Sequence, residues 1–287
     1  MAGIIDAHTH AFPPEMRANR ESFFDRDEWF RELYFNPKAL LTGEEELLES
    51  MDANGVDRAI IAGFPWADEG LCREHNQWMA EVCARHPKRL SFLAIVVPQA
   101  HSAASDAADA FAAGAIGIGE LNADAQRFDL LEPDSMRELV DFCTDQGKPI
   151  MLHSSEPLGH IYPGKGTATP DKLAVWLKAF PEQRVALAHW GGGLPFYELM
   201  PEIRELTRNV VYDTAATTYL YDFKVFAAAR TLVGSDRILF GSDFPVLGQR
   251  RLLKRVRDVV EDANDLQALL WDNAARFYGL DGEAAER

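Results

Sequence analysis

Short apolar runs alternate with helical patterns along the whole of this 287-residue chain. Eight of the runs have the length and β-branched content of buried strands, and they lie at 3–10, 58–64, 90–97, 115–121, 149–153, 185–189, 210–212 and 238–240. Helical periodicity fills the intervals, at 44–53, 71–85, 103–113, 134–146, 171–180, 195–207, 222–233, 251–261 and 265–278. Strands that alternate with helices form parallel sheets with right-handed crossovers, and eight such units in this length are typical of a (β/α)8 barrel.

The alternative architecture is a doubly wound open sheet. That fold usually carries a glycine-rich phosphate-binding turn after its first strand, whereas here His8-Thr9-His10 occupies the position. No strand–helix unit is long enough to form a domain of its own. We therefore expect a single α/β domain over residues 1–287, folded as a TIM barrel with a long loop after the first strand.

That loop covers residues 11–41 and is much longer than the other connections. It is rich in aromatic and charged side chains, and it is either a surface excursion packed by its own aromatic rings or a lid over the barrel mouth. We favour the lid, because long ordered loops at a barrel mouth commonly shape substrate pockets.

The amino-acid composition limits the kinds of partner that this protein can bind. The formal net charge is −16, which disfavours nucleic acid or an anionic membrane as the main partner but still permits a small anionic substrate. The odd set Cys72, Cys83 and Cys143 contains no C-x-x-C pair and argues against a disulfide framework. With no leader-like or membrane-spanning run, we expect a soluble, cytoplasmic protein whose partner is a small molecule.

Metal-binding residue types recur where the predicted strands end. His8 and His10 are two positions apart, so a strand would place both imidazoles on one face, where they could bind zinc or a similar ion. Later runs end in Glu120, His153, His189 and Asp243. Each alone has an ordinary explanation, such as a core histidine or a helix cap. Because strand ends meet at one face of a barrel, six together favour a site for one or two divalent ions.

Four short segments carry a family resemblance: DAHTH at 6–10, LH at 152–153, AHWGGG at 188–193 and FGSDFP at 240–245. Together they resemble the amidohydrolase superfamily, in the amidohydrolase-related branch that includes aminocarboxymuconate-semialdehyde decarboxylase. The resemblance covers essentially the whole chain. It identifies the superfamily well and the substrate poorly.

The resemblance implies roles for these residues. His8, His10 and Asp243 would bind the metal together, and His153 would be a further ligand. His189 would be a ligand or would polarise the substrate carbonyl, while Asp243 would take a proton from metal-bound water as general base. Zinc is the expected ion, with manganese or another divalent ion as the alternative. Similar proteins commonly form dimers, so a homodimer stays open.

Glu120, in GIGEL at 117–121, departs from the decarboxylase members, which do not rely on a metal-binding glutamate at this position. The TatD-like deoxyribonucleases of the same superfamily do use one, to join two metals. No lysine stands at the end of this fourth strand to be carbamylated, as one is in other members. We therefore favour a two-metal site bridged by Glu120.

The leading functional hypothesis is a metal-dependent hydrolase of a small amide, ester or lactone that uses metal-activated water. The alternative is a non-oxidative decarboxylase or hydratase of an unsaturated or aromatic carboxylic acid. Glu120 favours hydrolysis, whereas the sequences around His189 and Asp243 favour the decarboxylase branch. The acidic composition argues against a TatD-like nuclease. A barrel that had lost its activity would lack some of the candidate metal ligands, whereas all of them are present in this sequence.

Several aromatic side chains near strand ends are candidates for the pocket wall, although some of them would simply belong to the core. They are Phe12, Trp66, Trp190, Tyr219 and Phe244.

Overall fold

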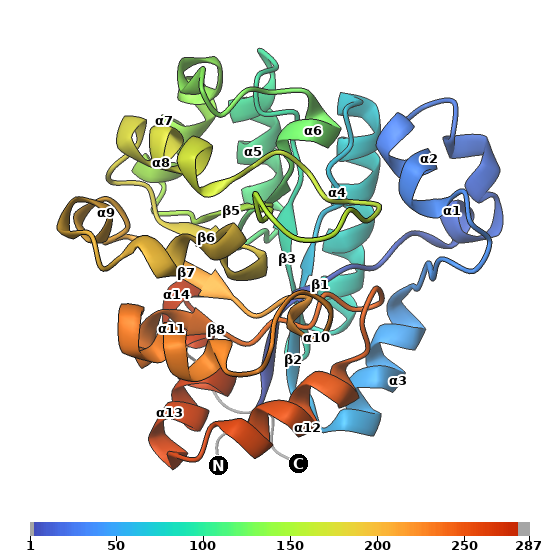
Figure 1. The fold of residues 1–287 in the computed structure, drawn as a ribbon. Helices are drawn as coiled ribbons and strands as arrows, with labels where there is room; N and C mark the ends of the chain where they lie inside the picture. The colour runs from blue at the N-terminus through green and yellow to red at the C-terminus, as the bar shows by residue number, and fades with distance from the viewer. Residues whose placement is uncertain (1–2, 281–287) are drawn as a thin grey trace.

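Eight parallel strands, hydrogen-bonded in the order β1 to β8, form the centre of the computed structural model, which describes residues 3–280 (Figure 1). They are β1 (Ile5–Thr9), β2 (Arg58–Ala62), β3 (Leu90–Ala94), β4 (Gly117–Leu121), β5 (Ile150–Leu152), β6 (Val185–Leu187), β7 (Val210–Asp213) and β8 (Ile238–Leu239). Each strand overlaps one predicted run, and the (β/α)8 barrel is confirmed. The ends of the predicted 1–287 domain lie outside the described residues.

The strands are apolar on both faces because both faces are buried. Side chains such as Ile5, Ile60 and Leu93 fill the barrel interior, while neighbours such as Ile61 and Phe92 belong to the core between strands and helices. Strands covered on both sides read as continuous apolar runs in sequence rather than as alternating ones. This is why each of the eight strands appears in the sequence as an apolar run.

The seam between the first and last strands is closed by main-chain hydrogen bonds. Ala7 N donates to Phe240 O over 2.8 Å, and Asp243 N donates to His8 O over 3.0 Å. The second bond places Asp243 directly beside the first strand, although the two residues are distant in sequence.

Asp6 strengthens the same seam with its side chain. Its fully buried carboxylate accepts hydrogen bonds from Ser242 N (2.9 Å), Ser242 Oγ (2.6 Å) and Gln249 Nε2 (2.8 Å). Burial raises the pKa of Asp6 to about 6, against the lowering effect of these bonds. Asp6 therefore anchors the segment that carries Asp243 to the strand that carries His8.

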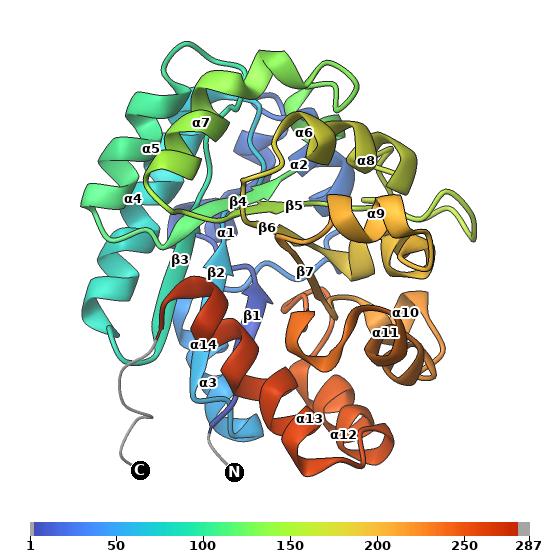
Figure 2. The ribbon, with the colours of Figure 1, turned by 90° about the vertical axis from the view of Figure 1, so that its left-hand side faces the viewer.

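Helices surround the strands (Figure 2). They are α3 (Glu44–Asn54), α4 (Glu69–Arg85), α5 (Ala103–Ala112), α7 (Arg137–Asp145), α8 (Pro170–Ala179), α9 (Pro201–Leu206), α11 (Val225–Val233), α12 (Gln249–Val259), α13 (Ala263–Gln267) and α14 (Asn273–Tyr278), with short α6 (Ala123–Gln126) and α10 (Thr217–Leu220) in loops. None of the helices among the described residues is long and apolar enough to cross a membrane.

The structure divides two of the predicted helices into shorter elements. The helix expected at 195–207 is divided into a 3-10 segment, His189–Tyr197, and α9, which begins at Pro201. Proline is favoured at the first turn of a helix and excluded from its interior, so Pro201 starts a new helix. The helix expected at 265–278 contains a π-helical turn, Ala268–Asp272, between α13 and α14.

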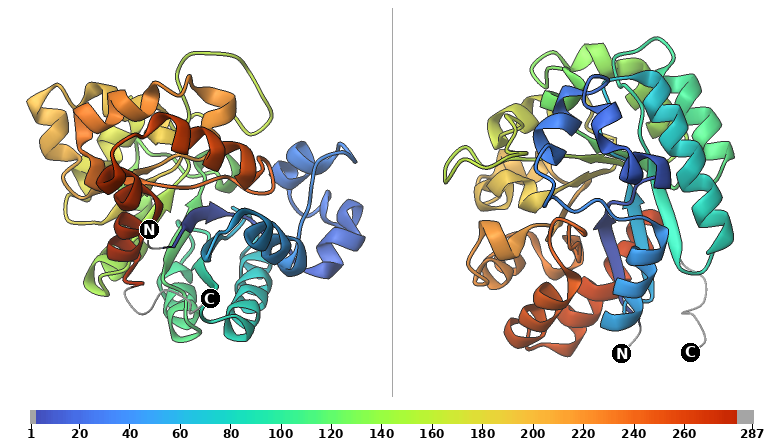
Figure 3. Two further views of the ribbon diagram at one scale, coloured as in Figure 1. Left: turned by 90° about the horizontal axis from the view of Figure 1, so that it is seen from below. Right: turned by 90° about the vertical axis from the view of Figure 1, so that its right-hand side faces the viewer.

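The aromatic segment at 11–41 folds into α1 (Pro14–Ala18), a 3-10 turn (Arg20–Phe23) and α2 (Glu28–Tyr34), and it projects from one side of the barrel (Figure 3). Phe30 of α2 packs its ring 5.5 Å from Phe64, which lies in the loop after β2. The segment therefore lies on the side of the strand carboxyl ends, not beneath the opposite end. Its role as a lid stays a prediction.

His75 of α4 links this segment to the barrel. Its ring is fully buried, its Nε2 donates to Ala11 O over 2.9 Å, and its Nδ1 accepts a hydrogen bond from Trp66 Nε1 over 3.1 Å. Burial is the main cause that lowers the pKa of His75, from 6.5 to about 4. The folded protein thus holds His75 neutral at pH values where the unfolded chain protonates it.

We predict an acid-sensitive contribution to stability from His75. Because the pKa of His75 is lowered on folding, its contribution to stability is complete above pH 6.5 and is lost as the pH falls towards 4. The stability lost by pH 5 is about 2 kcal/mol. Urea unfolding at pH 7 and pH 5 measures it. His75→Gln should lower stability at pH 7 and reduce the pH dependence, whereas an unchanged pH dependence would contradict this assignment.

Candidate metal centre

The first group of ligands comes from the two strands at the seam. His8 and His10 both turn their Nε2 atoms to the barrel mouth, with 3.2 Å between the two nitrogens. Asp243 Oδ1 lies 3.6 Å from His10 Nε2 and 3.9 Å from His8 Nε2. All three side chains are buried, and their ligand atoms lie close enough together to hold one ion.

The second group comes from β4 and the ends of β5 and β6. Glu120 Oε1 lies 2.9 Å from His153 Nδ1 and 3.4 Å from His189 Nε2. The other oxygen of Glu120, Oε2, lies 3.5 Å from His8 Nε2 and 3.7 Å from His10 Nε2. The Glu120 carboxylate thus lies between the two groups, and all six residues predicted from the strand ends come together at one place.

Hydrogen bonds on the far side of His8 and His10 test whether these residues fit a cation. His8 Nδ1 faces Asp213 Oδ2 at 2.8 Å, and His10 Nδ1 faces Ala62 O at 3.1 Å. Both partners are acceptors, so each neutral ring carries its proton on Nδ1 and turns an Nε2 lone pair inward. Two Nε2 atoms 3.2 Å apart must share either a proton or a cation, and the donor set therefore fits a divalent ion.

Electrostatics support this assignment. Burial lowers the pKa of His8, but the negative charges of Asp213 and Glu120 outweigh burial and raise it. For Glu120 burial acts to raise the pKa, and the neighbouring His8 and His153 bring it well below its usual range. The pKa of His189 rises to about 9, because hydrogen bonding and charge from Glu120 exceed the effect of burial. The centre is therefore arranged to keep Glu120 ionised beside positive charge.

Asp213 is a residue of the candidate site that the sequence analysis missed. It is the last residue of β7 and is fully buried. Oδ2 accepts the His8 Nδ1 hydrogen bond, while Oδ1 accepts one from His189 N over 2.9 Å. The other candidate ligands were predicted from their positions at strand ends. Asp213 has such a position too, but the predicted seventh strand ended one residue early, at Tyr212.

Replacing Asp213 with Asn should weaken metal binding by roughly 10–100-fold, because the amide turns a donor towards His8 Nδ1 and disturbs its tautomer. Titration of the metal against a competing chelator measures this change. Asp258→Asn, an exposed substitution on α12, is the matched control. An Asp213→Asn protein with the affinity of the control would show that Asp213 does not position His8.

The chain turns sharply after His189, with left-handed φ angles from His189 (56°) to Gly193 (94°). At Gly192 an added Cβ would lie 2.3 Å from Ser155 O, in the loop after β5. Glycine is required here both for the backbone conformation and for this close approach. The glycine run thus brings the loops after β5 and β6 into direct contact beside His153 and His189.

The structure places the five predicted pocket residues in different surroundings. Phe12, Trp66 and Trp190 are fully buried, and the indole of Trp190 donates to Thr217 Oγ1 over 2.8 Å. Tyr219 is half exposed, and Phe244 is partly buried. Their role as a pocket wall stays a prediction.

A model of the amidohydrolase family matches residues 5–280. This chain belongs to the amidohydrolase family. The resemblance inferred from the four sequence segments is thereby confirmed. The chain is 26% identical over 303 residues to a 6-methylsalicylic acid decarboxylase of Aspergillus aculeatus, an alignment that covers 90% of this chain and 89% of the relative.

Solved structures share its fold. The chain superposes on 5-carboxyvanillate decarboxylase from Sphingomonas paucimobilis with a TM-score of 0.78 and 18% identity, over 97% of this chain and 99% of that one. For 2,6-dihydroxybenzoate decarboxylase from Rhizobium the TM-score is 0.71 with 20% identity, over 98% and 100% of the two chains. A dihydroxybenzoic acid decarboxylase from Polaromonas, with bound manganese and 2-nitroresorcinol, has a TM-score of 0.70 and 18% identity over 99% and 98%.

These relatives change the order of the functional hypotheses. Each is a decarboxylase, so they favour the alternative activity of the sequence analysis over the hydrolase that led it. They do not favour zinc over other divalent ions, because the ion bound in the Polaromonas decarboxylase is manganese. A divalent metal remains the cofactor that fits the two groups of side chains at this centre.

Proposed function

We propose that this protein is a metal-dependent decarboxylase that releases carbon dioxide from a small aromatic carboxylic acid. The observation that carries the proposal is the match to a 6-methylsalicylic acid decarboxylase along nine tenths of the chain. The convergence of six nitrogen and carboxylate ligands supports a cation-assisted reaction.

His8, His10 and Asp243 would hold a divalent ion, with Glu120 and His153 beside them. When bound, the ion supplies a Lewis-acid charge that attracts the substrate carboxylate and stabilises negative charge as the reaction proceeds. Asp213 contributes indirectly, because it keeps the His8 Nε2 lone pair turned inward.

Decarboxylation breaks the bond between the ring and the carboxylate. The electron pair stays on the ring carbon, carbon dioxide leaves, and the carbon must receive a proton. We assign that proton transfer to Asp243, which would take up a proton from solvent and pass it to the ring carbon; its side chain is almost completely buried at the centre. His189 turns its Nε2 to the same centre, 3.4 Å from Glu120 Oε1, and we assign it the orientation of the substrate carboxylate.

Glu120 makes this centre suitable for two ions. Its two oxygens face separate groups of histidines, as a bridging carboxylate requires. Metal analysis of the saturated protein should give two ions per chain for the wild type and one for Glu120→Gln. An unchanged stoichiometry in Glu120→Gln would contradict bridging.

A substrate panel tests the proposed function. Manganese-loaded protein is offered 6-methylsalicylic acid, 2,6-dihydroxybenzoate and 5-carboxyvanillate, together with aryl esters and lactones as hydrolase substrates. We expect carbon dioxide from at least one of the acids and none with His10→Ala. Hydrolysis of an ester or lactone without carbon dioxide release from any acid would overturn the proposal.

A further inference from the structure

Tyr34, the last residue of α2, carries a hydroxyl group that the protein does not satisfy. Its side chain is only 5% exposed, and its Oη has no hydrogen-bond partner among the described residues. That oxygen is nevertheless open to solvent, unlike the hydroxyl of Tyr278, which is buried without a partner. A buried tyrosine usually finds a partner for its hydroxyl, so Tyr34 is placed to bond to a group that the protein itself does not supply.

The ring of Tyr34 packs on residues that adjoin the metal ligand His10. Its centroid lies 5.5 Å from that of Phe12 and 6.0 Å from that of Phe64. Phe12 follows His10 by two residues, and Phe64 follows by two residues Ala62, whose carbonyl oxygen faces His10 Nδ1. Direct packing therefore fixes Tyr34 beside the strand ends that hold His10 in place.

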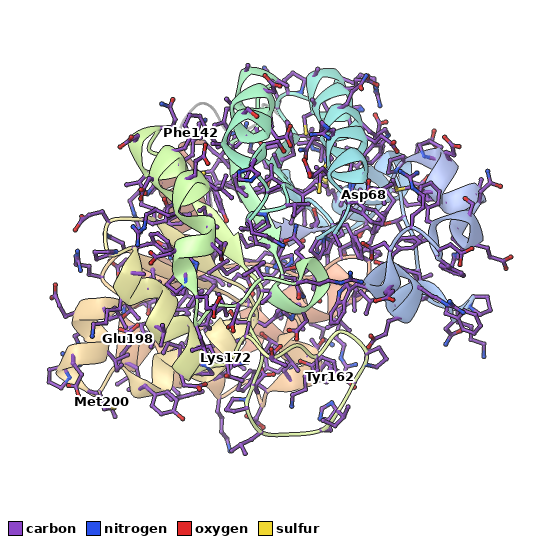
Figure 4. All side chains as sticks on the ribbon, turned by 90° about the horizontal axis from the view of Figure 1, so that it is seen from above. Asp68, Phe142, Tyr162, Lys172, Glu198 and Met200 are labelled. Carbon is purple, nitrogen blue, oxygen red and sulfur yellow. The ribbon has the colours of Figure 1, made fainter. Side chains whose placement is uncertain are left out.

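Leu33, the residue before Tyr34, shows that α2 reaches the loop that leaves the metal centre. The extended loop after β5 (Figure 4) passes close to α2, since a Cβ added at Gly164 would lie 3.2 Å from Leu33 Cδ2. In the same loop, a Cβ added at Gly166 would lie 3.6 Å from His153 Cδ2. The loop therefore runs from beside His153 to α2, and the two segments meet at the barrel mouth.

The charges near Tyr34 agree with this placement. Burial is the main cause that raises the pKa of its phenol, and the carboxylate of Asp243 raises it further, while Arg20 acts in the opposite direction. The phenol therefore keeps its proton at neutral pH and can donate a hydrogen bond to an anion.

We propose that Tyr34 is a positioning residue, whose hydroxyl donates a hydrogen bond to the carboxylate of the aromatic acid at the metal centre. The carboxylate is present in every substrate of the proposed class, and as an anion it only accepts hydrogen bonds. This inference rests on the proposed function. It gives the segment at 11–41 a direct part in substrate binding.

Tyr34 and His189 approach the substrate from opposite sides. Tyr34 packs on Phe64 after β2, whereas His189 follows β6, and these strands are four apart in a barrel of eight. Two polar groups on opposite sides fix the direction of the carboxylate, and with it the orientation of the ring that must receive the proton.

Tyr34→Phe tests the hydroxyl alone, because phenylalanine keeps the packing of the ring. Calorimetric titration of manganese-loaded protein with 2-methylbenzoic acid measures binding, and steady-state kinetics give KM for 6-methylsalicylic acid. We expect Tyr34→Phe to weaken binding and to raise KM by about 10-fold or more, with unchanged metal content, because a hydrogen bond to a charged group is lost. Tyr278→Phe on α14 removes the other unpartnered hydroxyl, is the matched control, and should change neither value.

The outcomes separate this inference from the proposed function. If Tyr34→Phe changes neither value while the wild type releases carbon dioxide, the positioning role is wrong and the proposed function stands. If KM rises but 2-methylbenzoic acid binds as before, Tyr34 bonds to the ring hydroxyl that only 6-methylsalicylic acid carries, and the assignment to the carboxylate is wrong. Lost metal in Tyr34→Phe, with affinity restored by excess manganese, would show a structural role instead. A wild type that binds neither acid overturns both proposals.

Discussion

Replacing His10 with Ala will remove the divalent ion and lower carbon dioxide release by about 10³-fold or more, well beyond the roughly 10–100-fold effect of an outer-sphere change. His10 Nε2 lies beside His8 Nε2 and Asp243 Oδ1, and its loss leaves too few ligands to hold the ion tightly. Metal content after dialysis and the rate of carbon dioxide release measure the two effects.

His10 is a better test position than His8 for a physical reason. His8 is paired with the fully buried carboxylate of Asp213, and removing its ring would leave an unpaired buried charge that destabilises the fold. His10 Nδ1 is bonded only to Ala62 O, so its removal costs less stability. His101→Ala, at an exposed position, is the matched control and should keep both metal and activity. Full activity in metal-free His10→Ala would refute the metal assignment.

Asp243→Asn will lower turnover by roughly 10²–10⁴-fold, the range of a lost proton transfer, while the protein keeps most of its metal. Asparagine preserves the size and one oxygen of the side chain but cannot carry the proton to the ring carbon. The main-chain bond from Asp243 N to His8 O is unaffected, so the fold at the seam is retained.

The comparison of kcat with metal content separates two roles for Asp243. A large fall in kcat with unchanged metal content supports proton transfer. A fall in both by the same factor, restored by excess metal, would mean that Asp243 acts only as a ligand. Asp258→Asn again serves as the control, because it removes an exposed carboxylate near the C-terminal end of α12.

The sequence was sufficient to predict the barrel and the group of six side chains at its mouth because both depend on local patterns. Strands buried on both faces are continuous apolar runs, and their carboxyl ends share one face, so His8 and Asp243 could be grouped without any knowledge of their distance. Asp213 follows the same rule and was missed only through a strand boundary placed one residue short. Strand boundaries are the least certain part of such a prediction.

Other features depend on contacts that no local pattern contains. The buried environment of His75 is recognisable only once the surrounding segments are in place, since its partners Ala11 and Trp66 come from different loops. The same is true of Trp190, which local position suggested as a pocket residue and which the structure buries completely. Loop packing, rather than periodicity, determines these environments.

The most direct test of the central claim follows the fate of the ring carbon. Manganese-loaded protein is incubated with 6-methylsalicylic acid in D₂O, and proton NMR and carbon dioxide release are recorded together. The account predicts one deuterium at the carbon that carried the carboxylate and one equivalent of carbon dioxide, with neither in His10→Ala. Unchanged acid, from a protein that is metal-loaded and hydrolyses an ester or lactone, would contradict it.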